Sequence, residues 1–261
     1  MAEQQKWKTD PSLYDAPTKQ EGLQTKKNLD YENTYVDEFL NKDPLRDWES
    51  IDRCIWLWEW SLDQIGANVS TQWEDGKIKH PKTDNWSVLD VGTKDAQFPQ
   101  WLRDMGVMGM GIEISEPYIK YATEKGRPIY MGNACDMTFA DNQFNYVFSH
   151  HLHGLLPDYL KGLQEMYRVT NKYMICLNQV PGNPKKHYSY IETPQIYEDF
   201  VQSIDCNVIY NDFLETGFSN EWVCFIEKKL PEGFFHGPDL PKPDFDVTEE
   251  EAEISFKRKK K

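Results

Sequence analysis

The chain of 261 residues lacks any long hydrophobic run, since apolar residues make up 39% of it and charged residues 28%. A bilayer-spanning helix needs roughly 20 consecutive, mostly apolar residues, and no such stretch occurs. The first ten residues, Met1–Asp10, are polar and contain no apolar signal-peptide core. We therefore expect a cytoplasmic protein with no membrane partner.

Cysteines are few, odd in number and widely spaced, at Cys54, Cys135, Cys176, Cys206 and Cys224. No two of them form the C-x-x-C pattern of a metal or redox motif. Separated cysteines of this kind are typical of reduced thiols in the cytosol, where most serve as small buried apolar side chains. The pattern therefore excludes a disulfide framework and gives no metal site.

The chain also lacks a basic excess: Lys and Arg number 29 against 43 Asp and Glu, for a formal net charge of −14. Such an acidic balance argues against a dedicated nucleic-acid binder. The exception is the basic end Lys257–Lys261, which could contact phosphates or act as a targeting signal. The simpler interpretation is a solvated terminus beside the acidic run Glu249–Glu253.

Three parts follow from the distribution of apolar residues. Residues 1–42 are polar and aperiodic, and we expect an arm that is disordered or docked and that could contact a protein partner. Residues 43–229 should form one folded domain, and residues 230–261 a charged tail. Aromatic residues, 14% of the chain, can fill a core that few aliphatic residues supply.

Within the domain, a helix is predicted over Asp47–Ile65, with Asp47 as its N-cap and Gly66 as its stop. Its apolar face comprises Ile51, Cys54, Ile55, Trp58, Leu62 and Ile65, while Trp56 and Trp60 lie off this face and could form a lid or partner surface. A loop is expected over Thr71–Asp84.

Strand and helix patterns then alternate, which indicates βαβ units and a mainly parallel sheet of the α/β class. Strands are expected at Trp86–Val91, Gly109–Ile114, Pro128–Met131, Phe144–Ser149, Tyr173–Asn178, Asn207–Asn211 and Glu221–Lys228, and helices at Gln97–Met105, Glu116–Lys125, Leu156–Val169 and Thr193–Ile204.

Four segments of this region carry chemistry. In Val88–Ala96 a buried strand runs into a glycine turn and a helix, which lets a ligand approach the backbone closely. The second strand closes with an acid in Gly111–Ser115, where a carboxylate can accept both hydroxyls of a ribose. Gly132–Phe139 and Asp141–Ser149 follow in the same order and at similar spacing.

Together these segments resemble the class I S-adenosylmethionine-dependent methyltransferases, especially the type 11 group. That family shows a D-x-G-x-G-x-G turn, an acid ending the second strand, a G-D-A-x-x-L-P-F segment and D-x-S-F-D-x-V. Gln164–Val169 also resembles its E-x-x-R-V-L helix end. The resemblance covers Trp86–Asn178 and extends loosely to Lys228. It implies a Rossmann-like fold with a seven-stranded sheet, helices on both faces and a terminal antiparallel strand.

The resemblance also implies that S-adenosylmethionine is the cofactor and that a small molecule is the methyl acceptor. Asp90 would organise the turn, Glu113 would hold the ribose, and Ile114 would pack on the adenine. The cofactor-binding residues implied in this way are Asp90, Gly92, Thr93, Lys94, Glu113, Ile114, Asn133, Ala134, Cys135 and Ser149.

Several positions depart from the family pattern. Lys94 and Ala96 replace the second and third glycines, Asn133 and Asn145 replace acids, and Thr138 replaces proline. Lys94 places a cation where the methionine end of the cofactor approaches. It could swing out, pair with the cofactor carboxylate, favour an anionic ligand or fill an empty site. Asn133 can still accept a hydrogen bond from the adenine amino group.

Three histidines, His150, His151 and His153, follow the fourth strand, where the family places residues that face the substrate. They are candidates for catalysis as a general base. They could equally form a pocket wall, because methyl transfer to a good nucleophile needs mainly positioning and desolvation. No Glu-x-x-His pattern completes a metal shell around them.

Two other functions are compatible with a fold of this kind. A degenerate methyltransferase domain with a structural or interaction role would explain Lys94, Asn133 and the charged arms. A nicotinamide-dependent oxidoreductase would need a three-glycine turn that Val88–Ala96 does not supply.

Overall fold

A computed structural model of the chain describes residues 44–67, 72–74, 77–79, 86–156, 158–179, 194–215 and 220–230. The predicted N-terminal arm, and the predicted tail beyond Leu230, lie outside the described residues. Among the residues described, no helix has both the length and the apolar content that crossing a membrane would require.

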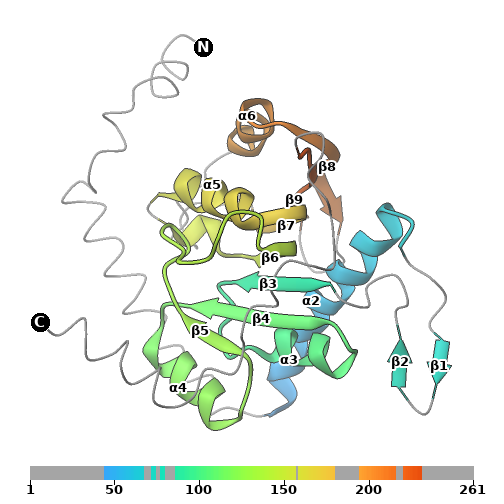
Figure 1. The fold of residues 1–261 in the computed structure, drawn as a ribbon, viewed down its shortest axis with the longest axis vertical. Coiled ribbons are helices and arrows are strands. Elements are labelled where there is room, and N and C mark those ends of the chain that lie inside the picture. Colours follow the sequence, from blue (N-terminus) through green and yellow to red (C-terminus); the bar gives the residue numbers. More distant parts are fainter. Residues whose placement is uncertain are drawn as a thin grey trace, which may run out of the picture.

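A seven-stranded sheet forms the centre of the molecule, in the order β5-β4-β3-β6-β7-β9-β8 (Figure 1). Neighbouring strands from β5 to β7 pair in parallel, and β9 runs antiparallel to both of its neighbours. The predicted fold class is therefore confirmed. The strands are β3 (Ser87–Val91), β4 (Met108–Glu113), β5 (Ile129–Met131), β6 (Phe144–His150), β7 (Thr170–Gln179), β8 (Cys206–Glu215) and β9 (Asn220–Lys228).

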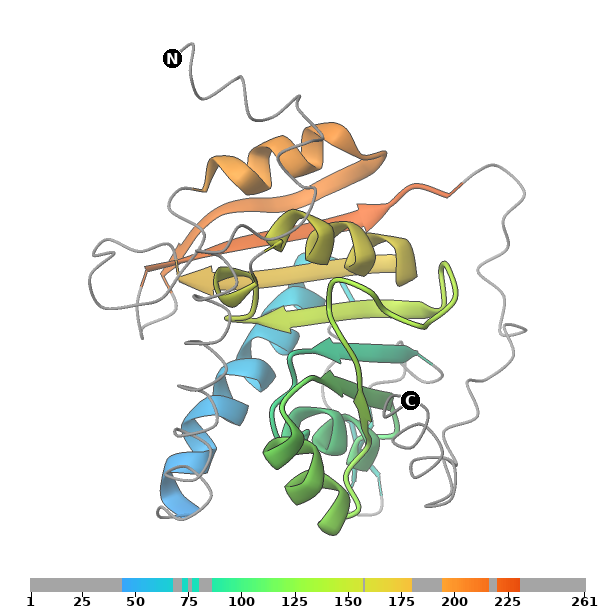
Figure 2. The ribbon, with the colours of Figure 1, turned by 90° about the vertical axis from the view of Figure 1, so that its left-hand side faces the viewer.

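Helices cover both faces of the sheet, with α2 and α5 on opposite sides (Figure 2). Side chains alternate along the strands: Val88 and Phe148 face a core beneath α2 and α3, whereas Leu89 and Val147 face a core beneath α5 and α6. The helices are α2 (Pro44–Gln64), α3 (Gln97–Asp104), α4 (Glu116–Glu124), α5 (Tyr159–Val169) and α6 (Gln195–Ser203), with a short 3₁₀ turn at His153–Leu155.

Helix α2 begins three residues earlier than predicted, so Asp47 lies inside the helix and is not its N-cap. Its buried face is also rotated from the predicted one, because it includes Leu57 and Ser61. Ser61 is tolerated there since its hydroxyl donates to the Trp58 carbonyl at 2.7 Å and accepts from the Tyr146 hydroxyl at 2.6 Å.

The aromatic residues of α2 pack on the sheet. Trp58 is fully buried and meets Tyr146 edge to face at 4.8 Å between ring centroids. Trp60, which the sequence places off the main face, lies against Tyr210 of β8 at 5.2 Å and stacks on Trp56 at 6.4 Å. With these contacts, α2 lies across one face of the sheet, from β8 toward β3.

The predicted loop over Thr71–Asp84 is wrong in part, because it contains a small antiparallel pair of strands. β1 (Gln72–Glu74) pairs with β2 (Lys77–Lys79), with Trp73 opposite Ile78. The two residues between these strands, Asp75 and Gly76, have the Asp-Gly sequence favoured in two-residue hairpins. That signal was available in the sequence and was overlooked.

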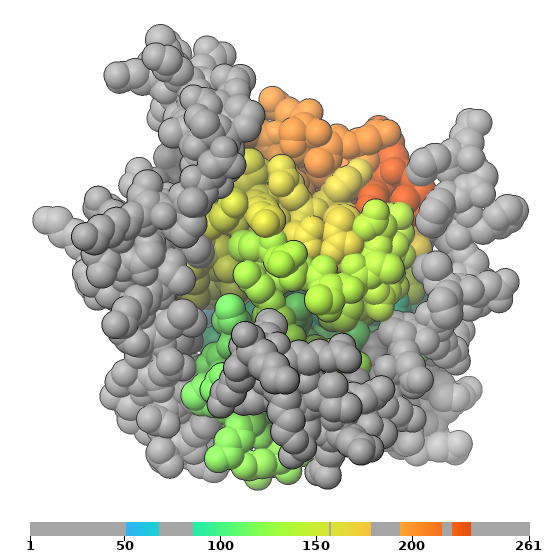
Figure 3. Space-filling view, turned by 60° about the vertical axis from the view of Figure 1, so that its left-hand side comes forward, coloured from blue at the N-terminus to red at the C-terminus, as the bar shows by residue number. Residues whose placement is uncertain are grey.

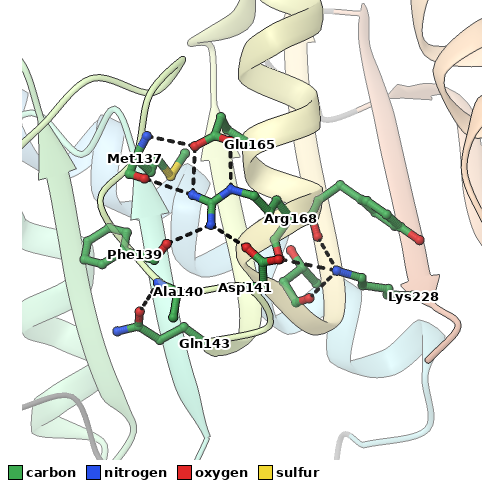
Figure 4. Close-up of polar contacts among 10 residues, drawn as sticks. Met137, Phe139, Ala140, Asp141, Gln143, Glu165, Arg168 and Lys228 are labelled. Atoms are coloured by element: carbon green, nitrogen blue, oxygen red, sulfur yellow. Dashed lines mark hydrogen bonds and ion pairs between the residues drawn. The ribbon is translucent and has the colours of Figure 1, made fainter. Parts of the chain in front are cut away.

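The segment between β5 and β6 is fastened to α5 by one arginine (Figure 4). Arg168 donates to both carboxylate oxygens of Glu165 at 2.8 Å, to the carbonyls of Met137 and Phe139 at 2.9 and 2.7 Å, and to the Asp141 carboxylate at 2.8 Å. In Figure 3 this segment, in lime, occupies the middle of the face between α4 and α5. The fork of Arg168 thereby fixes a segment that begins at the predicted adenine-binding residues.

Candidate functional site

The strand order reverses between β3 and β6, and a pocket lies there at the carboxyl ends of the two strands. Open α/β sheets bind ligands at such switch points. Its lining comes from α2, the turn after β3, the start of α3 and the end of β6: Ile51, Cys54, Asp90, Gly92, Thr93, Lys94, Asp95, Gln97, Phe98 and His150.

The turn after β3 keeps a glycine-like backbone although only its first position is glycine. Gly92, Lys94 and Ala96 have φ angles of 78°, 55° and 57°, all in the left-handed region. These are the positions of the three glycines in the family pattern. The turn is held by hydrogen bonds from the Gly92 and Thr93 amides to the Ile112 carbonyl, at 2.9 and 3.2 Å. Replacing two glycines has therefore not changed the path of the backbone.

Glu113, at the end of β4, supports this turn through its carboxylate. One oxygen accepts the Lys94 amide at 2.9 Å, and the other accepts the amides of Ile114 and Ser115 at 2.8 and 3.0 Å. The carboxylate is thus oriented by the backbone beside the turn.

Asp90 lies at the bottom of the pocket and is 4% exposed. Burial raises the pKa of Asp90 to about 7, the negative charges of Glu113 and Asp95 add to the effect, and the hydrogen bond from the Thr93 hydroxyl, at 2.6 Å, opposes it. Asp95 in turn pairs with Arg127. A buried acid with a raised pKa, Asp90, and an acid paired with an arginine, Asp95, therefore both lie beneath the turn.

The other predicted cofactor residues lie outside this pocket. Ile114 is 53% exposed, an apolar surface beside the Glu113 carboxylate. The Gly132 amide donates to the Glu113 carbonyl at 2.8 Å, which brings the next residue, Asn133, to the end of β4. Asn133 itself accepts the Cys135 amide at 2.9 Å, and Ala134 packs against the core beneath α5. Burial raises the pKa of the Cys135 thiol to about 11, which gives it no thiolate character near neutrality.

Two polar atoms at the end of β6 are buried and have no hydrogen-bond partner within the described part of the chain: Ser149 Oγ and His150 Nε2. Buried polar atoms are nearly always paired in proteins, so each needs an explanation. His150 lines the pocket, and burial, together with the nearby His151, Lys94 and Arg53, holds its pKa well below the usual range of histidine. A neutral imidazole is therefore available to a ligand there.

The three candidate histidines do not form one group. His153 is fully buried, 3.3 Å from Asn178 Nδ2 and edge-on to Tyr197 of α6, and burial lowers its pKa to about 3. His150 and His151 are stacked at 4.1 Å between ring centroids. His151 Nε2 lies 2.5 Å from Glu221 Oε1, an acid at the start of β9.

Sequence reasoning missed several residues that complete this region. Ile51, Cys54 and Phe98 line the pocket, and the acid Glu221 reaches the histidines from β9. Only the direction of the last strand could have indicated Glu221 from the sequence. An antiparallel last strand must begin at the edge where the parallel strands end, so its first residues lie at the ligand-binding edge.

Comparison with known proteins finds a family that matches part of the chain. Residues 89–176, which include the β3 turn, Glu113 and the end of β6, match the family model described as a methyltransferase domain. This part of the chain is therefore similar to a methyltransferase domain. A solved S-adenosylmethionine-dependent methyltransferase from Aquifex aeolicus shares the fold, with 20% identity, a TM-score of 0.50 and coverage of 75% of this chain and 98% of that one.

Magnesium protoporphyrin IX methyltransferase from Synechocystis PCC 6803, solved with S-adenosylmethionine bound, is a second structure of the same fold. It is 12% identical, with a TM-score of 0.50, and the match covers 75% of this chain and 96% of that one. Both likenesses concern the architecture of the sheet and its helices.

Among curated proteins, a demethylmenaquinone methyltransferase of Lysinibacillus sphaericus is 28% identical over 141 residues, or 47% of this chain and 60% of the relative. The corresponding protein of Listeria welshimeri is 28% identical over 144 residues, or 47% of this chain and 61% of the relative. The match thus spans about three fifths of these relatives.

The residues of the pocket and those beside it fit S-adenosylmethionine. Gly92 has φ 78°, where any other residue would be strained, and a Cβ there would lie 2.9 Å from the end of the Leu152 side chain. The exposed apolar Ile114 and the oriented carboxylate of Glu113 lie at the end of β4, and His150 Nε2, which has no partner among the described residues, lies at the end of β6. An apolar surface, a hydroxyl acceptor and a polar pocket wall suit a nucleoside joined to an amino acid.

Proposed function

We propose that this protein transfers the methyl group of S-adenosylmethionine to a small-molecule acceptor. The observation that carries the proposal is the turn of Gly92 and Lys94 held against the Glu113 carboxylate at the switch point of the sheet. The family match over residues 89–176 supports it. The curated relatives, which are named for demethylmenaquinone, support an acceptor of small size.

In this proposal Glu113 accepts the ribose hydroxyls, Ile114 packs on the adenine, and Asn133, Ala134 and Cys135 border the base. Asp90 and Thr93 hold the turn, and Ser149 and His150 supply unpaired polar atoms at the end of β6. The bound cofactor supplies a methyl group on a sulfonium. The chain contributes mainly position and exclusion of water, which are large contributions for a bimolecular displacement.

Lys94 has a specific role here: its ammonium pairs with the carboxylate at the methionine end of the cofactor. The backbone of Lys94 is in the left-handed region, at φ 55°, where a side chain costs about 1 kcal/mol or more relative to glycine. A cation at the pocket compensates that cost when it binds an anionic group. This role accounts for a lysine in place of the second glycine of the family turn.

The test is isothermal titration of S-adenosylmethionine and S-adenosylhomocysteine into the wild type and two variants. Glu113→Gln should weaken both affinities by about tenfold or more, because it removes the charge from a hydrogen bond to the ribose. Lys94→Gly should weaken both affinities while raising the free energy of unfolding by about 1 kcal/mol, so lost binding cannot come from unfolding.

The matched control is Glu116→Gln, which removes an exposed acid three residues after Glu113 and should bind like the wild type. If the wild type binds neither compound at millimolar concentration, the proposal fails. A structural role for a degenerate domain then takes its place.

A further inference from the structure

A histidine and a buried acid form a pair beside the pocket, and the function proposed above does not use it. His151 follows β6, and Glu221 lies at the start of β9, which runs antiparallel to β7 with Gln179 opposite Glu221. His151 Nε2 and Glu221 Oε1 are 2.5 Å apart. The side chain of Glu221 is 1% exposed and that of His151 27% exposed, so the acid is enclosed and the imidazole reaches open space.

The imidazole of His151 is held in one orientation. The backbone of His151 lies in the left-handed region at φ 55°, and its amide donates to the Leu177 carbonyl at 2.8 Å. Its ring stacks on His150, which lines the pocket, with an interplanar angle of 17°. Strained backbone that the surrounding contacts hold in place is concentrated at functional sites.

The chemistry of the pair fixes which nitrogen is free. Where Glu221 is ionised, its carboxylate only accepts hydrogen bonds, and Nε2 is then the nitrogen that carries the proton. Nδ1 then carries the lone pair. Among the described residues Nδ1 has no hydrogen-bond partner. A carboxylate behind an imidazole fixes its tautomer and stabilises the imidazolium that forms when the free nitrogen takes up a proton.

The charges around the pair favour a base over a metal ion. Ligand atoms of His150, His151 and Glu221 lie within 4.8 Å of one another, a spacing that a metal could draw together. However, the guanidinium of Arg53, from α2, is 3.9 Å from the Glu221 carboxylate, and Lys94 lies in the same pocket as His150. Arg53 therefore already pairs with the acid, and the positive charges of Arg53 and Lys94 oppose a divalent ion.

We propose that His151 is the general base of this methyltransferase, that Glu221 is its positioning residue, and that the acceptor bears a phenol-type hydroxyl. This inference rests on the proposed function. The hydroxyl proton passes to His151 Nδ1, and the oxygen lone pair forms a bond to the methyl carbon of S-adenosylmethionine. The carbon–sulfur bond breaks, and its electron pair stays on sulfur as neutral S-adenosylhomocysteine.

The hydroxyl class follows from what needs a base. A neutral amine attacks through a lone pair it already has, and an activated thiol is ionised without help, whereas a neutral hydroxyl must lose its proton as it attacks. An aliphatic alcohol is far less acidic than an imidazolium, but a phenol is within a few pKa units of it. Phenol-type hydroxyls are therefore the acceptors for which an imidazole–carboxylate pair gives the largest advantage.

The test measures O-methyl transfer from methyl-labelled S-adenosylmethionine to two probes, phenol and 4-nitrophenol, at a pH where only the second is already ionised. His151→Gln keeps an amide donor for Glu221 but has no base, and should lower kcat for phenol about a hundredfold or more. It should change kcat for 4-nitrophenol by only a few fold. The affinity for S-adenosylhomocysteine, from titration, should not change.

The pH profile separates a base from a merely structural residue. A general base gives kcat an acid limb, so the wild type should lose activity on phenol toward acid pH, and His151→Gln should lack this limb. Among the described residues, Glu221 and His150 contact His151, Arg53 lies 3.9 Å from the Glu221 carboxylate, and Lys94 acts on His150, whose pKa burial keeps low. Glu221→Gln should lower kcat on phenol about tenfold or more, whereas Glu227→Gln, which removes an acid at the other end of β9, should leave it unchanged.

Three outcomes overturn the inference: equal losses on both probes in His151→Gln, loss of wild-type activity on addition of EDTA, or no O-methylated product from either probe. In each case the wild type would still bind S-adenosylmethionine, and the proposed function would stand. Absence of cofactor binding by the wild type would overturn both.

Discussion

Three non-glycine residues around the pocket have backbones in the left-handed region: Lys94, Ala96 and His151. An L-residue in this region costs roughly 1–2 kcal/mol, so the conformation must be held by other contacts. The Lys94 amide donates to Glu113, the Ala96 amide to the Thr93 carbonyl, and the His151 amide to the Leu177 carbonyl. The strain at the switch point is thus maintained by hydrogen bonds to β4, β7 and the turn itself.

Asp90 gives this region a dependence on pH. Its folded-state pKa, about 7, lies above the ordinary value of 3.8, so between these values the folded state binds more protons than the unfolded state. The free energy of unfolding should therefore fall by up to a few kcal/mol as pH rises from about 4 to about 7. Asp90→Asn removes the ionisable group, so the free energy of unfolding of this variant should depend less on pH. Its stability relative to the wild type should therefore increase as pH rises.

Urea unfolding at pH 5 and pH 8 measures the difference. Asp52→Asn, which removes an exposed carboxylate of α2, is the control and should follow the pH dependence of the wild type. A variant Asp90→Asn whose pH dependence equals that of the wild type would show that Asp90 ionises freely in the folded protein.

Among the secondary-structure elements, α5 has the clearest dual task, because it packs on the sheet and also holds the segment between β5 and β6. Arg168 makes five hydrogen bonds to that segment and to Glu165, within α5, and these bonds hold the pKa of Glu165 below its usual value (Figure 4). Arg168→Ala should lower the free energy of unfolding by about 3 kcal/mol, since it leaves two carbonyls and two acids without their donor.

Arg168→Lys keeps the charge but not the planar guanidinium group. Its free energy of unfolding should fall by about half as much as that of Arg168→Ala. Chemical denaturation of the three proteins provides the comparison. A loss below about 1 kcal/mol in Arg168→Ala would mean that the segment is held by packing, with the arginine contributing only as a surface ion pair would.

The elements themselves were largely predictable from sequence, and the geometry of the site was predictable only in part. Alternation of apolar runs with amphipathic segments located the seven strands of the main sheet, because buried parallel strands and the helices beside them have distinct periods. The rotated face of α2 was not predictable, since burial of Ser61 depends on a hydroxyl of Tyr146, 85 positions away.

The pair of His151 and Glu221 shows the same limit at the site. These residues are 70 positions apart, and only the antiparallel registration of β9 on β7 brings them together. Sequence patterns report local periods, whereas contacts of this kind depend on strand order. The turn after β3, by contrast, was predictable because its path is encoded within a few residues, even where glycine is replaced.

At the scale of the whole molecule, one sheet separates two cores that depend on the same strands. Trp58 lies in the core beneath α2 and α3, and Phe200 in the core beneath α5 and α6. Neighbouring residues of β3, β6 and β7 point alternately into one core and the other, so neither core can form while those strands are unpaired. The pocket lies at the ends of these strands and depends on both cores.

We therefore expect the domain to unfold in one transition, whichever core is weakened. Trp58→Phe and Phe200→Leu should each lower the free energy of unfolding by about 1–2 kcal/mol, and the double variant should lose the sum within about 0.5 kcal/mol. Near-ultraviolet and far-ultraviolet circular dichroism should report the same midpoint in all four proteins. Separate transitions in either single variant would show that the two faces of the sheet are independent, in which case the switch-point pocket could be lost while half of the fold persists.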